Sequence, residues 1–286
     1  MSAGVALVEV PYAIGDERHP ASRGAERLVE AGAERALAAR GLAMTVARVE
    51  RGAPFADSAS ASLAVNKGVA RAVADAMAAG RLPIVLAGSC DVALGALAGF
   101  DHGRCGVVWL DAHADFNTPE STVSGFFPGM SAAVIAGHCY ASFWAQVGNS
   151  TPVAEDAIVM LGVRDLSPEA ERERLERSGI EVVPWQDGRP SGNVRASLDA
   201  LRARVAEVYV HVDLDALDPD AAPGIVDAPV PGGLSPEDAE DVLRAVAERF
   251  RVRAVALTTY NPALDEDEKT LRTALRLIDV VGECAA

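Results

Sequence analysis

The apolar run at residues 107–110 ends abruptly in Asp111-Ala112-His113-Ala114-Asp115. Because side chains alternate along a β-strand, Asp111, His113 and Asp115 leave the strand end on one side. Two carboxylates and an imidazole beside a buried strand need a charge partner or a metal to offset their desolvation. The segment therefore predicts a strand that runs into a metal site.

A second apolar run, at residues 208–212, ends in the same way in Asp213-Leu214-Asp215, and Pro219 stops the strand soon after. Ligands of open parallel α/β sheets bind at the carboxyl ends of the strands, so the two ends could converge on one site. Together they offer four carboxylates and one imidazole. This hard, oxygen-rich set suits Mn²⁺ better than a structural zinc.

Apolar runs of strand length alternate with helical patterns along the chain. We expect strands at residues 5–11, 44–49, 82–87, 106–110, 157–163, 181–183, 208–212 and 252–257. We expect helices at residues 25–40, 60–79, 168–178, 194–206, 236–250 and 269–281, and one that begins at Val92. This alternation predicts an α/β fold whose parallel sheet is covered on both faces. The 286 residues are a common size for one α/β domain and no linker divides them, so we predict one domain, 1–286.

The charge and the cysteine content of the chain limit its possible partners and its cellular compartment. A net charge of −15 argues against nucleic acid or an anionic membrane as a partner. The sequence has no basic, hydrophobic leader and no apolar run of membrane-spanning length. Its four cysteines show neither CxxC nor disulfide-framework spacing. We therefore predict a cytoplasmic protein with reduced thiols.

Taken together, these segments resemble the arginase/agmatinase family of ureohydrolases over most of the chain. Residues 111–118 look like the family's Asp-Ala-His-x-Asp-x-Asn motif, and residues 213–219 look like its second metal motif. Residues 88–91 stand in the place of its Gly-Gly-Asp-His segment, and residues 260–262 in the place of its late Asn-Pro element. The resemblance implies a three-layer α/β/α sandwich with a mostly parallel central sheet and a centre of two Mn²⁺ ions.

The resemblance also implies roles for individual residues. In the family, a water or hydroxide shared by the two ions attacks the guanidinium carbon of the substrate. Carried over by position, the metal ligands would be Cys90, Asp111, His113, Asp115, Asp213 and Asp215. Of these, Asp111 and Asp213 would bridge the ions, and Asp115 could also accept the proton of the shared water as a catalytic base. Family members form trimers or hexamers, so we expect a homo-oligomer.

Cys90 departs from the family, which places a histidine ligand there. A thiolate is softer than an imidazole and shifts the preference toward Zn²⁺, Co²⁺ or Fe²⁺. The other interpretation is that Cys90 is a small buried hydrophobe and that its metal is weakly held or absent. Asp91, directly before a predicted helix, is expected to cap that helix.

Pro128 stands where arginases place a histidine that shuttles protons. Proline cannot do this, so protonation of the leaving group needs another donor. His138 and His102 are the candidates, and we predict His138 as a catalytic residue.

Four further positions are predicted to contact substrate. Asn117 and Ser124 match residues that arginases use around the α-carboxylate, and Ser167 replaces an aspartate near the α-amino group. Thr259 replaces a glutamate that pairs with the guanidinium, and a hydroxyl supplies no counter-charge. The expected substrate is therefore less basic than arginine, and a hydroxyguanidine such as N-hydroxyarginine meets this condition.

The leading hypothesis is a two-metal hydrolase that cleaves a C–N bond in a small linear guanidine or amidine. One alternative is a deacetylase-like amidohydrolase with a single zinc ion. Another is a non-catalytic or metal-depleted family member with a binding role, because the usual histidine ligand, shuttle histidine and substrate glutamate are all replaced.

Overall fold

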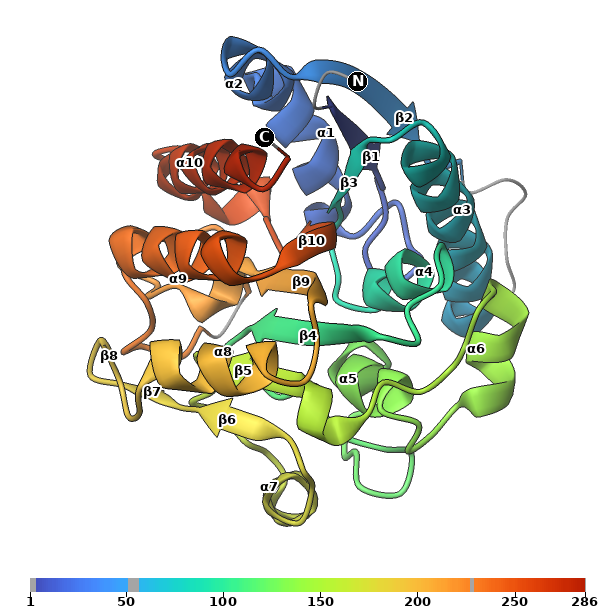
Figure 1. Cartoon of the computed structure of the whole chain (residues 1–286), viewed down its shortest axis with the longest axis vertical. Coiled ribbons are helices and arrows are strands. Elements are labelled where there is room, and N and C mark those ends of the chain that lie inside the picture. Colours follow the sequence, from blue (N-terminus) through green and yellow to red (C-terminus); the bar gives the residue numbers. More distant parts are fainter. Residues whose placement is uncertain (1–3, 51–56, 227–228, 286) are drawn as a thin grey trace.

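The structure, a computed structural model, describes residues 4–50, 57–226 and 229–285. Within these residues, eight strands form one parallel sheet in the order β2-β1-β3-β10-β9-β4-β5-β6, and β7 pairs with β8 in a separate antiparallel hairpin (Figure 1). The strands are β1 (Gly4–Glu9), β2 (Ala43–Arg48), β3 (Leu82–Leu86), β4 (Cys105–Leu110), β5 (Ile158–Leu161), β6 (Glu181–Val183), β7 (Trp185–Gln186), β8 (Arg189–Pro190), β9 (Glu207–Asp213) and β10 (Arg251–Thr258).

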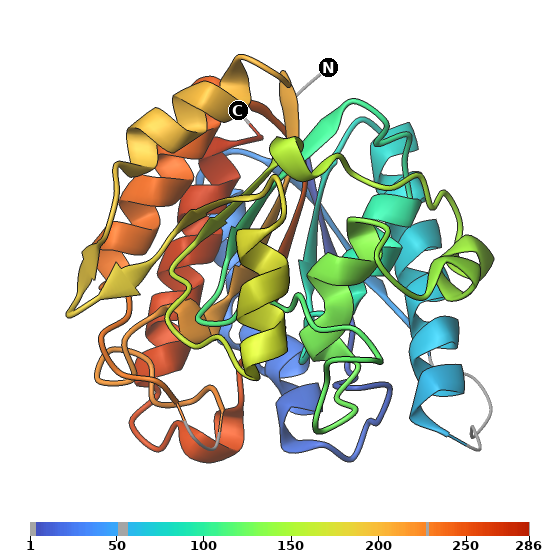
Figure 2. The ribbon, with the colours of Figure 1, turned by 90° about the horizontal axis from the view of Figure 1, so that it is seen from below.

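Helices cover both faces of the sheet. They are α1 (Gly24–Ala31), α2 (Ala33–Ala39), α3 (Ser58–Ala78), α4 (Val92–Ala98), α5 (Ser131–Ile135), α6 (Ala141–Val147), α7 (Glu169–Glu176), α8 (Val194–Arg202), α9 (Pro236–Arg249) and α10 (Lys269–Glu283). One layer contains α1, α2, α8, α9 and α10, and the other contains α3 to α6 (Figure 2). The predicted α/β/α sandwich with its parallel sheet is confirmed. Across the described ranges, no helix is both long enough and apolar enough to span a bilayer.

Burial explains why the central strands look as they do in the sequence. Every residue of β1, β3, β4 and β5 is buried, so these strands are nearly continuous apolar runs. The edge strand β2 is largely exposed, and β6 at the other edge is partly exposed. The apolar core therefore lies on both faces of the middle of the sheet.

Several elements differ from those expected. The helix predicted at residues 25–40 is two helices, because Gly32 has a φ of 112° and caps the end of α1 while α2 begins directly after it. The helices α5 and α6 and the hairpin β7–β8 were not predicted. They have seven residues or fewer, too short for a clear apolar period.

The order of the strands places the ends of four of them together. The strands β9 and β10, which come late in the chain, lie between β3 and β4. All four run parallel, so their carboxyl ends meet at one edge of the sheet. Figure 2 shows the loops that follow the strands gathered at its lower end. In open α/β sheets such an edge is where ligands bind.

Arg164, which follows β5, holds the turn after β9 in place. Its guanidinium donates hydrogen bonds to the backbone carbonyl oxygens of Asp215 at 2.7 Å, Leu217 at 3.1 Å and Val230 at 2.8 Å. A further bond reaches the carbonyl of Ala216 at 3.1 Å. The planar guanidinium offers five donors spread over three nitrogens, whereas an ammonium offers three donors from one nitrogen and cannot reach all of these carbonyls.

We therefore expect Arg164→Lys to lower the free energy of unfolding by about 2–4 kcal/mol, because several carbonyl groups lose a charged donor. Chemical denaturation measures this change. The matched control is Arg177→Lys, since Arg177 forms an exposed ion pair with Glu173 and should change stability by about 0.5 kcal/mol or less. Equal denaturation midpoints for the two variants would show that the carbonyl contacts contribute little.

Candidate metal centre

The six predicted metal ligands lie at the ends of three central strands. Cys90 follows β3, Asp213 is the last residue of β9, and Asp111 is the first residue after β4. One cavity of about 280 Å³ is lined by all six of them, Cys90, Asp111, His113, Asp115, Asp213 and Asp215. The structure thus brings the two sequence motifs and Cys90 together at one edge of the sheet.

His113 lies close to two carboxylates. Its Nδ1 is 3.0 Å from Oδ2 of Asp215 and 3.3 Å from Oδ1 of Asp111. On the other side of the ring, Nε2 is 4.0 Å from Oδ2 of Asp165. The ligand atoms of Asp111, His113 and Asp215 lie within 4.8 Å of one another, so a single ion could contact all three.

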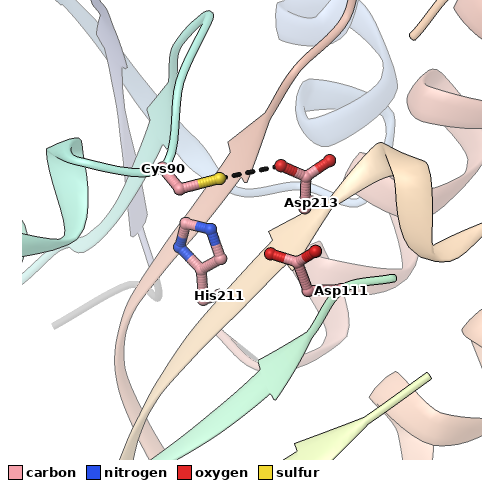
Figure 3. Close-up of side chains that lie close together, drawn as sticks. All are labelled: Cys90, Asp111, His211 and Asp213. Carbon is pink, nitrogen blue, oxygen red and sulfur yellow. Dashed lines mark hydrogen bonds between the residues drawn. The ribbon is translucent and has the colours of Figure 1, made fainter. Parts of the chain in front are cut away.

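Cys90 marks the other end of the centre. Its thiol donates to Oδ2 of Asp213 at 2.8 Å (Figure 3). Burial, followed by the nearby charge of Asp213, raises the pKa of Cys90 well above its usual value, so the thiol keeps its proton in the absence of a metal. A second set of close ligand atoms comprises Cys90, Asp111, Asp213 and His211.

His211 was not predicted as a site residue. It stands two residues before Asp213 inside an apolar strand, and burial lowers its pKa to about 3, so the ring is neutral. The signal that could have identified it is the two-residue period of the strand, which puts His211 on the same face of β9 as Asp213.

The carboxylates of the centre repel one another. Burial, reinforced by the neighbouring acids, raises the pKa of Asp111 and Asp115 well above the usual range and that of Asp213 to about 7. Burial acts the same way on Asp215, but contact with His113 outweighs it and lowers that pKa to about 2. For His113 itself, burial opposes the charge, but Asp111 and Asp215 raise its pKa far above the ordinary value. The raised pKa values reflect the cost of ionising several acids in one buried cluster, and bound cations would offset that cost.

Asp115 has a carboxylate oxygen with no partner. Its Oδ2 is buried, and no hydrogen bond reaches it from any described residue. The backbone of Asp115 has a φ of 47°, a conformation held by the amides of Ala132 and Ala133, which donate to its carbonyl at 3.0 and 3.2 Å. A buried carboxylate oxygen without a donor, on a residue that lines a cavity with other acids, fits a metal ligand, but Asp115 belongs to neither set of close ligand atoms found among the described residues.

Neighbouring side chains hold the ligands in position. Trp109 donates from Nε1 to Oδ2 of Asp111 at 3.0 Å, and Thr259, with a φ of 72°, donates its hydroxyl to Oδ2 of Asp213. Asp91 occupies the N-cap position of α4, as expected, but its side chain makes no capping hydrogen bond. Its carboxylate accepts from Ser89 at 2.6 Å and from Ser62. Asp91 instead anchors the segment that carries Cys90.

The predicted substrate residues divide between two cavities. Asn117, Ser124 and Ser167 line a second cavity of about 240 Å³, which shares His113 and Asp115 with the first. The side-chain amide of Asn117 donates to the carbonyl of Ser167 at 3.2 Å. Thr259 lies in the first cavity, beside the metal ligands. The structure therefore places an amino-acid-sized polar pocket next to the candidate metal centre.

The two histidines considered as proton donors do not line either cavity. His138 lies with Nε2 2.7 Å from Oε1 of Glu155, and its ring packs edge-on against Phe116. His102 is buried, stacks on Trp144, and has its ring nitrogens close to backbone carbonyls. These contacts give both rings structural partners and do not support a catalytic role for His138.

His19 lines the first cavity, although no sequence motif includes it. Its Nδ1 accepts a hydrogen bond from the amide of Ala21 at 3.3 Å. This contact engages Nδ1 and leaves Nε2 as the ring nitrogen that could exchange a proton with a ligand. Pro20 follows directly and begins a short 3₁₀ helix, so a rigid turn presents the imidazole.

Comparisons with known proteins agree with this site. The sequence matches the model described as Arginase family over residues 3–282. The arginase of Bacillus caldovelox is 34% identical over 218 residues, which cover 74% of this chain and 72% of that enzyme. The N(omega)-hydroxy-L-arginine amidinohydrolase of Streptomyces lavendulae is 30% identical over 216 residues, which cover 75% of this chain and 73% of that enzyme.

The fold is also similar to that of solved arginases. A crystal structure of arginase from Bacillus cereus superimposes with a TM-score of 0.87 at 28% identity, with 98% of each chain covered. The resemblance stated from the sequence is confirmed. The chain belongs to the arginase family and is a hydrolase of C–N bonds other than peptide bonds.

Proposed function

We propose that this hydrolase uses two divalent metal ions to cleave a C–N bond in a small linear guanidine, and that it prefers a hydroxyguanidine such as N-hydroxyarginine. The observation that carries the proposal is the single cavity lined by all six predicted ligands, in which Oδ2 of Asp115 has no other partner. Mn²⁺ is the expected ion, with Zn²⁺, Co²⁺ or Fe²⁺ as alternatives because Cys90 offers sulfur. The proposal includes the cytoplasmic homo-oligomer predicted from the sequence.

Different groups would perform the separate steps of hydrolysis. When bound, the two ions would lower the pKa of a water molecule and so supply a nucleophile near neutral pH. Asp115, whose Oδ2 is free of donors, would accept the proton that this water loses. His19, which lines the same cavity, would donate a proton to the departing amine.

The preference for a less basic substrate rests on Thr259. Its hydroxyl is already engaged with Asp213, and it carries no charge that could pair with a guanidinium. All the acidic side chains that line the first cavity are predicted metal ligands, so they are not available to pair with a guanidinium. A hydroxyguanidine is less basic than a guanidine and needs less counter-charge. The similarity to an enzyme named for N-hydroxyarginine supports this choice.

Substrate assays test the proposal directly. The protein, purified without chelator and loaded with Mn²⁺, Zn²⁺ or Co²⁺, should hydrolyse N-hydroxyarginine with a kcat/KM at least about tenfold above that for arginine, since a lost charge-assisted contact of about 1.4 kcal/mol changes the rate tenfold. Formimino compounds complete the screen. Equal rates for arginine would contradict the preference. One ion per chain would favour the single-zinc alternative, and no bound ion would contradict the metal centre.

Thr259→Glu tests the origin of the preference. A carboxylate at this position would pair with the guanidinium, so the ratio of kcat/KM for arginine to that for N-hydroxyarginine should rise by about tenfold or more. Thr259→Gln is the matched control, because it has the same size without the charge and also lacks the hydroxyl that binds Asp213. If both variants shift the ratio alike, charge is not the cause.

His19→Asn tests the proton donor. Losing a general acid should lower kcat by about 100-fold or more while the metal content stays at the wild-type level. His138→Asn, made in parallel, gives the competing outcome. If it lowers kcat and His19→Asn does not, His138 is the donor.

A further inference from the structure

We propose that His211 is itself a metal ligand, so that Cys90, His211 and Asp213 hold one of the two ions through sulfur, nitrogen and oxygen. The inference rests on the proposed two-metal function, but it assigns a ligand set that neither sequence motif contains. Three observations support it: the placement of His211, the contacts that orient its ring, and the weak hydrogen bond of its Nε2.

His211 lies deep in the middle of the sheet. It is on β9, paired with Trp109 of β4 on one side and Ala256 of β10 on the other, and it is 0% exposed. Figure 3 shows its imidazole beneath Cys90, with the side chains of Asp213 and Asp111 facing the same space. One ligand atom from each of the four residues lies within 4.8 Å of the others.

Two aromatic neighbours orient the ring. Trp109 stacks on it with a centroid separation of 3.7 Å and an interplanar angle of 13°. The hydroxyl of Tyr209 lies 2.9 Å from Nδ1. When Nδ1 carries the proton and donates it to Tyr209, the lone pair of Nε2 is free. Metal-binding histidines are commonly oriented in this way, by a hydrogen bond from the nitrogen that does not touch the ion.

The second ring nitrogen lacks a good protein partner. Nε2 lies 3.5 Å from the hydroxyl of Thr258, at the outer limit of a hydrogen bond. A buried histidine with a purely structural role normally has closer protein partners, as His102 does, whose ring nitrogens lie 2.7 and 2.8 Å from backbone carbonyl oxygens. Nε2 of His211 is therefore only weakly engaged by the protein, and an ion in the space shared with Cys90 and Asp213 would be a stronger partner.

The resulting donor set differs from that of the other ion. Sulfur and imidazole are softer ligands than carboxylate, so the site of Cys90 and His211 should prefer Zn²⁺, Co²⁺ or Fe²⁺. The site of Asp111, His113 and Asp215 keeps two carboxylates and suits Mn²⁺. Binding at Cys90 replaces the thiol proton, which passes to the solvent. The inference thus predicts a centre that binds two different metals.

Titration of the full chain with Co²⁺ tests this assignment, because thiolate bound to Co²⁺ absorbs in the near ultraviolet. The wild type should bind two ions per chain, one of them with the thiolate band. In His211→Gln, the dissociation constant of the thiolate-bound ion should rise by more than the roughly 10–100-fold expected for loss of an outer partner. Tyr209→Phe should stay within that range, and His102→Gln should leave the titration unchanged.

A second variant, in which the absorption should increase, distinguishes loss of a ligand from misfolding. In His211→Cys a second thiolate joins the same ion, so the thiolate band per bound Co²⁺ should about double. An unchanged band in His211→Cys, together with unchanged affinity in His211→Gln, would overturn the role of His211 and leave the two-metal hydrolase intact. A wild type that binds no Co²⁺ would overturn both this role and the proposed function.

Discussion

Four carboxylates share one buried cavity, and their mutual repulsion is the constraint on which the rest of the structure depends. Burial and the neighbouring acids disfavour the ionised forms of Asp111, Asp115 and Asp213, so other groups must offset this cost. The apolar strands and the two helical layers provide the rigid frame. The guanidinium of Arg164 then holds the turn beneath Asp215, and the indole of Trp109 holds Asp111. A bound cation would complete this arrangement by supplying the missing positive charge.

The sequence predicted those parts of the fold and site that follow from local periodicity. The acids after β4 and β9 were visible because an apolar strand ending in alternating polar residues is a local pattern. The parallel sheet followed from the alternation of buried strands and helices. The acids after β4 and β9 meet in one cavity because β9 lies directly beside β4. The sequence is compatible with this long-range pairing but does not specify it.

The remaining parts depend on three-dimensional neighbours. His211 lies within an apolar run and looks like a core residue, and only the pairing of three strands places it beneath Cys90. His19 reaches the cavity because its loop crosses the ends of the strands. The break at Gly32 depends on a backbone conformation that the helical pattern around it does not reveal. In each case the deciding contact comes from residues distant in the chain or from the backbone.

The position of β9 and β10 between β3 and β4 also sets the order in which the protein can mature on the ribosome. The strands β3 and β4, with the site residues that follow them, are synthesised early. The strands β9 and β10, which lie between them and contribute the remaining site residues, are among the last segments synthesised. A nascent chain therefore has no enclosed site in which to retain an ion. Metal capture at the proposed centre would therefore come late, after the middle of the sheet has been filled by its final strands.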